Sequence, residues 1–552
     1  MKNWGDLDAA FEKAHPPDEP GGAFGVFRHG RALYMRGYGS KRLGHKDRIG
    51  PRTVFDIASV SKQFTAFCIL LLQERGRLSM EDDFRKHLPE FDHTFSGIKI
   101  RHLVHHSSGL LGLLDLRWLD TLARAWEPGS PGYLALGSKQ KDRNFPAGQE
   151  HQYCNDGYVL LAEIIRRRSG LSLAEFAETK IFRPLNMTRT RFVGPGEARM
   201  PDHSEGHRLR KGRWEPSPRF VCTPGPGGLW TCIEDLGRWA KSLDEQSLGS
   251  PALYRAQLRP GKILLPSLDA PYAAGLFLDP SYGRLLACHN GGIPGFSSAF
   301  YWFPRQELSV VLLRNRESDP GLSASTVLDF VLKSTKSQAK AVPAHKTKFI
   351  PGPASPALKS TPGLYQGVHS ADLWELKSKR KGLLLNRGFP VRLVRTTAGR
   401  LSDPHYGTWW SVRLEPDASG TWQLRHYGGS KLLGILSRLG KTSAKIPGLA
   451  SLRGHYHNAS TGKRFDLRVV GAKLFYRDAY PDAYPDIPLR WLAPDKLVYT
   501  SDRVPSVDAY AQLDGNGYFQ VQRDSRGKAL GLLAFIPSNG CRRLRFAKKA
   551  KQ

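Results

Sequence analysis

Hydrophobic and polar residues alternate in two short runs within Ala23 to Tyr38, on either side of a His-Gly-Arg turn. This period of two predicts a β-hairpin with one buried face. A longer apolar run extends from Ser59 to Gly76, where hydrophobic residues recur at helical spacing and a glycine ends the segment. That spacing predicts a helix with one buried face. The apolar positions of this helix are Phe64, Phe67, Ile69, Leu70 and Leu71.

Strand and helix patterns return between residues 299 and 333. The pattern predicts strands at Ala299 to Phe303 and Leu308 to Leu313, then a helix at Ala324 to Lys333. A hairpin, helices, further strands and a closing helix predict an antiparallel sheet flanked by helices, in an α/β (α+β) domain of residues 1–335. Residues 336–360 are rich in Lys, Pro, Ser and Ala and therefore predict a linker.

Beyond the linker the pattern changes to short alternating strands separated by Gly, Asp and Asn turns, as in Lys431 to Ser437. Such strands are typical of antiparallel barrels. Pro-Gly-Leu-Tyr at 362–365 and Arg-Gly-His-Tyr at 453–456 open two similar segments, which indicates either a duplicated domain or a coincidence of a common tripeptide shape. We predict two small antiparallel β-barrel domains, at 361–445 and 446–552.

The composition is that of a globular protein, because 40% of its 552 residues are hydrophobic. The first residues include acids and prolines where a secretory signal needs a basic start and an apolar stretch. The apolar runs fall far short of the ~20 residues that span a bilayer. Six scattered cysteines without a Cys-x-x-Cys pair argue against a zinc module or a disulfide framework. We expect a cytoplasmic protein with reduced thiols, no metal, no cofactor and no membrane association.

The net charge of +32 is concentrated in the second part of the chain. Residues 331–552 hold 38 Lys and Arg against 14 Asp and Glu, a net of +24. This asymmetry indicates either an anionic partner or a solvated basic surface, and we favour the surface. In the basic tail, Arg542, Leu544 and Phe546 alternate in the manner of a last strand, so we do not expect a nucleic acid partner.

A Ser-x-x-Lys spacing joins Ser59 to Lys62. Only this occurrence opens a strongly apolar helix, which places the lysine one turn along the same face as the hydroxyl. A serine becomes a good nucleophile when a base removes its proton, and a lysine partly removed from water can be that base. The alternative is an N-cap serine with a solvent-exposed lysine. The same spacing also begins at Ser96, Ser138, Ser337, Ser378, Ser460 and Ser525.

The run Phe55 to Ala66, FDIASVSKQFTA, resembles the active-site helix start of the β-lactamase and penicillin-binding superfamily, particularly its class C and D-aminopeptidase branch. Together the similar segments cover nearly all of residues 20–330 in the family's order. The segment Ile100 to Leu110 resembles a region between catalytic elements, and we assign it no catalytic role. The remaining similar segments are Pro146 to Asn155, Gly227 to Ala240 and Cys288 to Ser298.

The resemblance implies further site residues. It places the family's Tyr-x-Asn at Tyr153 and Asn155, where the phenol would pass the serine proton to the leaving group and the amide would hydrogen-bond the substrate. A buried tyrosine with a satisfied hydroxyl is the alternative at Tyr153. The backbone N–H groups of Ser59 and Gly292 would form the oxyanion hole.

The third family motif, Lys-Thr-Gly in many relatives, reads His289-Asn290-Gly291 here, as in the D-aminopeptidase and esterase branch. A lysine would attract a substrate carboxylate through its fixed charge. A neutral histidine gives a hydrogen bond and a pH-dependent charge instead. The substitution therefore argues against penicillin hydrolysis and D,D-carboxypeptidase activity.

D-Aminopeptidases, which this architecture resembles, cover their substrates with a loop from the last domain. The candidate loop here is Tyr476 to Pro488, an acidic segment that contains Asp478, Asp482 and Asp486. A carboxylate in a partly dry site binds an ammonium group well, so we expect one of these aspartates to bind the substrate amine. The alternative is a surface turn formed by the repeated Asp-Ala-Tyr-Pro.

The resemblance and the residues lead to one principal prediction. We expect a serine hydrolase that forms an acyl-enzyme on small-molecule or short-peptide amides, in particular an aminopeptidase or amidase for D-amino-acid derivatives. The alternatives are a carboxylesterase or β-lactamase-related hydrolase with the same site, and a non-catalytic protein with basic β domains. A homodimer is one alternative for the oligomeric state.

Overall fold

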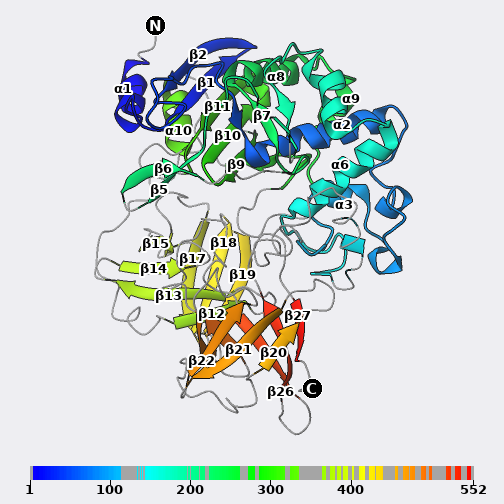
Figure 1. Ribbon diagram of the computed structural model, residues 1–552, viewed down its shortest axis with the longest axis vertical. Helices are drawn as coiled ribbons and strands as arrows, with labels where there is room; N and C mark the ends of the chain where they lie inside the picture. Colours follow the sequence, from blue (N-terminus) through cyan, green and yellow to red (C-terminus); the bar gives the residue numbers. More distant parts are fainter. Residues whose placement is uncertain are drawn as a thin grey trace.

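The computed structural model describes the first 334 residues in most detail, and the remainder of the chain as backbone strands between 363 and 548 (Figure 1). The described residues before the strands are 4–112, 134, 137–138, 140, 143–194, 197–198, 200–210, 212–217, 223–261, 271–279, 285–317 and 324–334. The predicted linker, 336–360, lies outside the described residues.

A six-stranded antiparallel sheet, in the order β2-β1-β11-β10-β9-β8, lies at the centre of the first part. The predicted hairpin is confirmed, because β1 and β2 pair around His29 and Gly30, which both have positive φ angles. Strand β1 also pairs with β11, so the start and the end of this part meet in the sheet. The strands are β1 (Gly22–Arg28), β2 (Arg31–Tyr38), β8 (Phe277–Asp279), β9 (Leu286–Ile293), β10 (Phe296–Phe303) and β11 (Leu308–Arg314).

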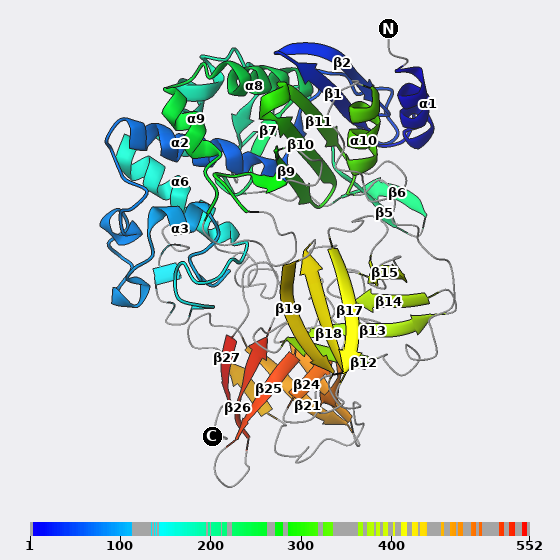
Figure 2. The same cartoon turned by 180° about the vertical axis from the view of Figure 1, so that it is seen from behind.

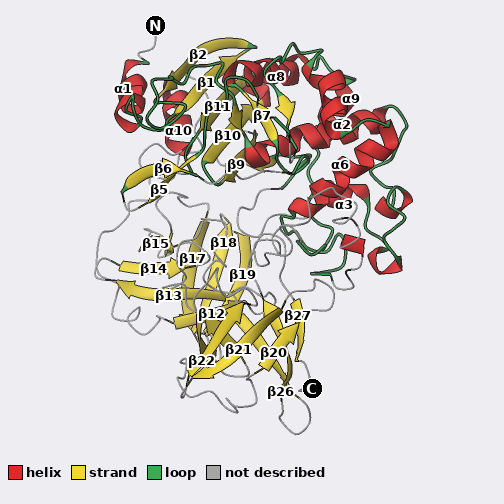
Figure 3. Ribbon diagram, viewed as in Figure 1, coloured by secondary structure: helices red, strands yellow, loops and turns green. Residues whose placement is uncertain are grey.

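Helices cover both faces of this sheet, as the sequence predicts (Figure 3). In β1, Phe24 and Val26 pack in one apolar cluster with α1 and α10. Ala23 and Phe27 belong to the larger cluster on the other face, with α2 and α8. Alternate side chains of one strand therefore enter different layers. The helices are α1 (Gly5–Ala14), α2 (Lys62–Glu74), α3 (Ile100–Val104), α6 (Asn155–Ser169), α7 (Leu173–Ala177), α8 (Ile233–Glu245), α9 (Pro251–Gln257) and α10 (Ala324–Ser334).

Helix α2 differs from its prediction in two respects. It begins at Lys62, because Ala58–Ser61 form a separate 3-10 turn, η1. Every residue from Lys62 to Leu72 is buried, since α6, α7 and α9 also contact this helix. The expectation of a single buried face was therefore wrong. Gly76, with a φ of 66°, lies just beyond the end of the helix as predicted.

The remaining short strands hold loops close to the sheet. Strands β3 and β4 both pair with β7, and β5 pairs with β6. These strands are β3 (Phe55–Asp56), β4 (Arg191–Phe192), β5 (His207–Arg210), β6 (Arg213–Pro216) and β7 (Leu229–Thr231).

Among the described residues, Cys68, Cys154, Cys232 and Cys288 are free thiols. No helix in the described part of the chain combines the length and the apolar character needed to cross a bilayer.

Strands β12 to β19 close one antiparallel barrel and β20 to β27 close another. Figures 1 and 2 show these strands below the helix-covered sheet from opposite sides. The similar segments at 362–365 and 453–456 overlap the first strand of each barrel. The strands are β12 (Gly363–Gly367), β13 (Leu373–Lys379), β14 (Gly382–Asn386), β15 (Pro390–Arg395), β16 (Leu401–Ser402), β17 (Trp410–Pro416), β18 (Trp422–Gly428), β19 (Lys431–Arg438), β20 (Gly454–His457), β21 (Arg464–Val470), β22 (Lys473–Asp478), β23 (Ile487–Leu492), β24 (Lys496–Tyr499), β25 (Tyr518–Arg523), β26 (Ala529–Phe535) and β27 (Leu544–Lys548).

Candidate active site

Ser59 and Lys62 lie one turn apart, where η1 passes into α2. The Nζ atom of Lys62 lies 3.1 Å from Oγ of Ser59 and donates to the carbonyl of Pro226 at 2.8 Å. Lys62 is 0% exposed, whereas Ser59 is partly exposed. A buried amine in hydrogen-bond contact with an accessible hydroxyl is suited to removing the proton of a serine nucleophile.

The loop before β7 holds the start of α2 from the side. The hydroxyl of Thr65 donates to the carbonyl of Gly225 at 2.8 Å, and the backbone N–H of Leu229 donates to Oγ of Ser61 at 3.3 Å. Together with the bond from Lys62 to Pro226, these contacts fix the loop against the helix. The residues just before the similar segment Gly227 to Ala240, together with its first residues, therefore orient the lysine.

The backbone immediately before Ser59 is strained. Ala58 has a φ of 47°, in the left-handed region, which costs a residue with a Cβ atom about 1–2 kcal/mol. Its N–H donates to Oδ1 of Asp56 at 2.8 Å, and the Ile57 carbonyl accepts from Oγ of Ser298 at 2.7 Å. Burial raises the pKa of Asp56 to about 7. Backbone strain held in place by buried polar contacts is typical of functional sites.

Tyr153 comes to the same place from a distant part of the chain. The Nζ atom of Lys62 lies 4.8 Å from the centre of the Tyr153 ring and 5.5 Å from that of Tyr158. Tyr153 lies two residues before the start of α6. The first residue of this helix, Asn155, is partly exposed. The structure thus brings Ser59, Lys62 and Tyr153 together, with Asn155 at the adjoining helix start.

His289 lies within β9, opposite Phe300 of β10, whereas the strand predicted in this region begins only at Ala299. Its Nδ1 atom is 2.6 Å from the Asn290 carbonyl, and its Nε2 atom is 3.1 Å from the hydroxyl of Tyr272. Because a carbonyl only accepts, Nδ1 is the donor, and Nε2 of the neutral ring accepts from Tyr272. The His289 ring centre lies 6.0 Å from that of Tyr153.

The charge expected at His289 requires a correction. Burial, together with the positive charge of Lys62, lowers the pKa of His289 to about 3. The imidazole is therefore neutral throughout the neutral pH range, and the expected pH-dependent charge develops only as the pH falls toward about 3. What remains of the prediction is a neutral hydrogen-bonding group in place of a fixed positive charge.

The buried neutral state of His289 leads to a prediction about stability. Between about pH 3 and about pH 6.5, the unfolded chain binds a proton at this residue that the folded chain does not. The contribution of His289 to the free energy of unfolding is therefore complete above about pH 6.5 and declines as the pH falls toward about 3. His289→Gln removes this titration, so its melting temperature should fall less steeply than that of the wild type on acidification. Thermal melts of both proteins across this range test the expectation, and parallel curves contradict it.

Gly291 and Gly292 follow His289 on β9. A Cβ atom at Gly291 would lie 2.3 Å from the Ile57 carbonyl oxygen and 2.3 Å from Oγ of Ser298, so only glycine allows this strand to approach the turn before Ser59. Gly292 is opposite Ser297 in the β9–β10 hairpin. The oxyanion hole formed by the N–H groups of Ser59 and Gly292 stays a prediction.

Of the three aspartates in the predicted loop, Asp478 is the last residue of β22, opposite Phe465. Asp482 and Asp486 lie outside the described residues. The arrangement of the acidic cluster around the site therefore stays a prediction.

Three residues that contact the site were not predicted from the sequence. Tyr272 is buried beneath His289, Asp56 holds the backbone before Ser59, and His106 packs against Tyr153 at 4.3 Å between ring centres. Tyr272 belongs to no recognisable motif, whereas Asp56 lies within the similar run Phe55 to Ala66 but was assigned no role there. His106 lies in Ile100 to Leu110, a segment that we noted but did not assign to catalysis.

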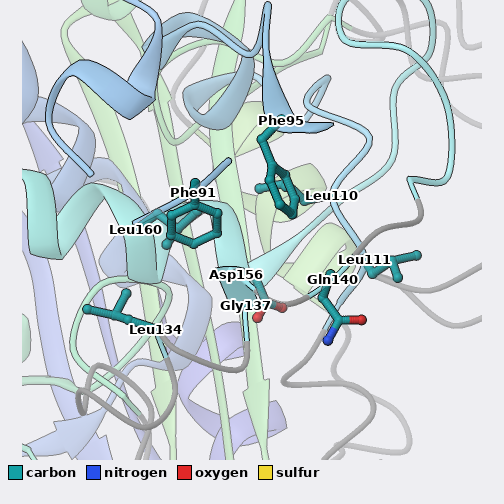
Figure 4. Close-up of a pocket in the computed structure, with 9 residues that line it drawn as sticks. All are labelled: Phe91, Phe95, Leu110, Leu111, Leu134, Gly137, Gln140, Asp156 and Leu160. Atoms are coloured by element: carbon teal, nitrogen blue, oxygen red, sulfur yellow. The ribbon is translucent and has the colours of Figure 1, made fainter. Parts of the chain in front are cut away.

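A small apolar cavity of about 20 Å³ lies beside the start of α6 (Figure 4). Its lining includes Phe91, Leu110 and Leu160, and Figure 4 shows Asp156 near the middle of the lining side chains. Neither Ser59 nor the residues in contact with it line this cavity. It is therefore separate from the serine site and lies beside the first turns of α6, the helix that begins two residues after Tyr153.

An antiparallel sheet between two helical layers, with a serine and a buried lysine at the start of the central helix, defines the β-lactamase-like class of serine hydrolase folds. The Beta-lactamase family model matches residues 9–330. The chain belongs to this family, whose members are serine hydrolases.

Two relatives carry names that bear on function. The D-aminopeptidase of Gluconobacter oxydans (strain 621H) is 29% identical over 320 residues, which cover 56% of this chain and 58% of the relative. Penicillin-binding protein 4* of Bacillus subtilis (strain 168) is 28% identical over 340 residues, which cover 57% of this chain and 72% of the relative. The similarity thus spans less than two thirds of the D-aminopeptidase.

Solved structures share the fold at lower identity. The octameric penicillin-binding protein homologue from Pyrococcus abyssi has a TM-score of 0.53 and 20% identity, covering 86% of this chain and 98% of its own. The penicillin binding protein from Bacillus halodurans has a TM-score of 0.51 and 22% identity, covering 60% of this chain and 99% of its own. At these identities the likeness concerns the fold alone.

Proposed function

We propose that this protein hydrolyses small amides through an acyl-enzyme on Ser59, most specifically as an aminopeptidase or amidase for D-amino-acid derivatives. The observation that carries the proposal is the 3.1 Å contact between Oγ of Ser59 and Nζ of the fully buried Lys62. The similarity to a D-aminopeptidase supports this substrate class. Neutral His289 supports it too, because it provides no fixed charge for a substrate carboxylate.

In the proposed reaction, Oγ of Ser59 attacks the substrate carbonyl carbon while the neutral amine of Lys62 takes the hydroxyl proton. The carbonyl oxygen becomes an oxyanion that accepts hydrogen bonds from the N–H groups of Ser59 and Gly292. The C–N bond then breaks, and a proton relayed through Tyr153 converts the departing nitrogen to a neutral amine. Water attacks the acyl ester in the same way, releasing the acid and restoring the hydroxyl of Ser59.

The strained turn before Ser59 has a clear part in this scheme. The left-handed backbone at Ala58, held by Asp56, sets the direction in which the chain enters η1 and so orients Ser59, the next residue. The hydroxyl is thereby partly exposed, while its base stays buried one turn further along. A nucleophile held in one orientation loses little entropy on reaction.

A panel of chromogenic substrates tests the proposal. D-Alanine and L-alanine p-nitroanilides, p-nitrophenyl acetate and nitrocefin are offered to the wild type and to Ser59→Ala. Cleavage of the D-anilide alone among the amides supports the proposed function, and cleavage of the ester alone identifies a carboxylesterase. Nitrocefin cleavage identifies a β-lactamase-related hydrolase. No cleavage of any substrate, with tight binding of a polyanion, identifies the non-catalytic alternative.

The C-terminal part extends the proposal to substrate recognition. We propose that residues 361–445 and 446–552 are two β-barrel domains and that the loop between β22 and β23 contributes an aspartate to the site. Replacing Asp482 with Ala should then raise the KM of D-alanine p-nitroanilide about tenfold or more, because an ion pair with the substrate ammonium is lost. The KM of p-nitrophenyl acetate, which lacks an amine, should change little. Steady-state kinetics test this, and equal losses on both substrates contradict it.

The cytoplasmic location and the homodimer stay predictions.

A further inference from the structure

His106 binds the backbone on both sides of Tyr153. Its carbonyl accepts from the N–H of Gln152 at 2.8 Å, and its Nδ1 atom accepts from the N–H of Cys154 at 3.1 Å. One residue, remote in sequence, therefore holds both amides that flank the phenol. Cys154 is also the N-cap residue of α6 and makes no side-chain cap of its own.

The imidazole of His106 also packs against the phenol itself. The centre of its ring lies 4.3 Å from that of Tyr153, 4.5 Å from that of Tyr272 and 5.2 Å from that of Tyr158. The side chain is only 1% exposed. Contacts of this kind, together with the two backbone bonds, restrict the position and the tilt of the Tyr153 ring.

The bond to Cys154 requires an unprotonated Nδ1 atom, and the surroundings of His106 favour that state. Burial lowers the pKa of His106 well below its usual value, and electrostatic interactions with His151 and Lys62 act in the same direction. The neutral ring then carries its proton on Nε2. Nδ1 is therefore available as an acceptor at neutral pH.

The backbone at His106 is itself unusual. Its φ of 55° lies in the left-handed region, which few residues other than Gly, Asn and Asp adopt without cost. The turn continues to Gly109, where a Cβ atom would lie 1.9 Å from the Phe145 carbonyl oxygen. This strained turn directs both the ring and the carbonyl of His106 toward the backbone on either side of Tyr153.

We propose that His106 is a positioning residue for Tyr153, which it holds at the distance from Lys62 and Ser59 that proton transfer requires. The inference rests on the proposed function and deepens it by assigning a role to the segment Ile100 to Leu110. His106 itself touches no reacting atom in this scheme. Its effect should therefore appear only in the step that depends on the phenol.

That dependence gives a specific experiment. An anilide needs a proton on its leaving nitrogen, whereas p-nitrophenolate leaves an ester without one. His106→Leu removes the acceptor for Cys154 and should lower kcat/KM for D-alanine p-nitroanilide by roughly 10²-fold, the effect of losing a general acid. The loss on p-nitrophenyl acetate should stay below about tenfold. His106→Asn keeps a short acceptor and tolerates the left-handed backbone, so it should restore most of the anilide activity.

A double-mutant cycle with Tyr153→Phe separates positioning from general weakening of the fold. If His106 acts through Tyr153, His106→Leu should cause little further loss on the anilide once the phenol is absent. His106→Gln, which moves the acceptor away from Cys154, takes the place of the leucine variant if that protein does not fold. Losses that multiply, or equal losses on anilide and ester, overturn the inference alone. A wild type that cleaves neither substrate overturns the proposed function and this inference with it.

Discussion

Replacing Ser59 with Ala is expected to lower turnover of any true substrate by about 10³-fold or more, the scale seen when a nucleophile is removed. The methyl group cannot form the acyl ester, while Lys62 and the backbone around it stay in place. Substitution of one partly exposed oxygen should leave the fold unchanged. Steady-state kinetics, with labelling of the protein by a fluorophosphonate probe, measure the loss of turnover and of the reactive hydroxyl together.

A matched control comes from another Ser-x-x-Lys spacing in the same chain. Ser96 is exposed, and the lysine three residues on, Lys99, donates to Glu81 at 2.7 Å. Ser96→Ala should therefore leave both turnover and labelling at the wild-type level. Retention of turnover by Ser59→Ala, or loss of labelling in Ser96→Ala, would show that the reactive hydroxyl is elsewhere.

The contrast between these two serines shows what the sequence could predict about the site. Ser59 and Lys62 lie within one helical turn, so their contact follows from local geometry once the helix is recognised. The apolar context that marks this helix reflects its burial on all sides. At Ser96 the same spacing falls on an exposed turn, where the lysine contacts an acid instead.

The rest of the site depends on contacts between residues far apart in the chain. Tyr272 contacts His289 from a segment outside the strand of His289. His106 likewise contacts Tyr153 from a separate segment of the chain. No local periodicity encodes such pairs, because each partner has its own local pattern. The neutral state of His289 is likewise a result of complete burial, which the motif alone does not specify.

The same distinction applies to the fold. The hairpin of β1 and β2 and the strands β10 and β11 follow from alternation along the chain, and their positions were predicted closely. The pairing of β1 with β11, almost three hundred residues apart, was not predicted, because alternation within either strand does not identify its partner. The left-handed residue that begins η1 was not predicted, because Ala58 carries no signal for a positive φ.

Lys62→Met should cause a loss comparable to that of Ser59→Ala, about 10³-fold or more in kcat. Methionine matches the length of the lysine stem and is readily accommodated in a buried site. It removes the amine, so Oγ of Ser59 has no base one turn away. The carbonyl of Pro226 loses a donor, which costs about 1–3 kcal/mol, but a buried polar amine no longer has to be removed from water. Thermal melts should therefore show a folded protein with a modest change in melting temperature.

Lys62→Arg distinguishes a base from a fixed positive charge at this position. Arginine keeps the charge but does not release its proton in proteins. If Lys62 accepts the proton of Ser59, Lys62→Arg should be nearly as inactive as Lys62→Met and should react as slowly with a fluorophosphonate. Turnover by Lys62→Arg within about tenfold of the wild type would mean that the amine acts through its charge, because a group that stays protonated cannot take up the proton of the serine.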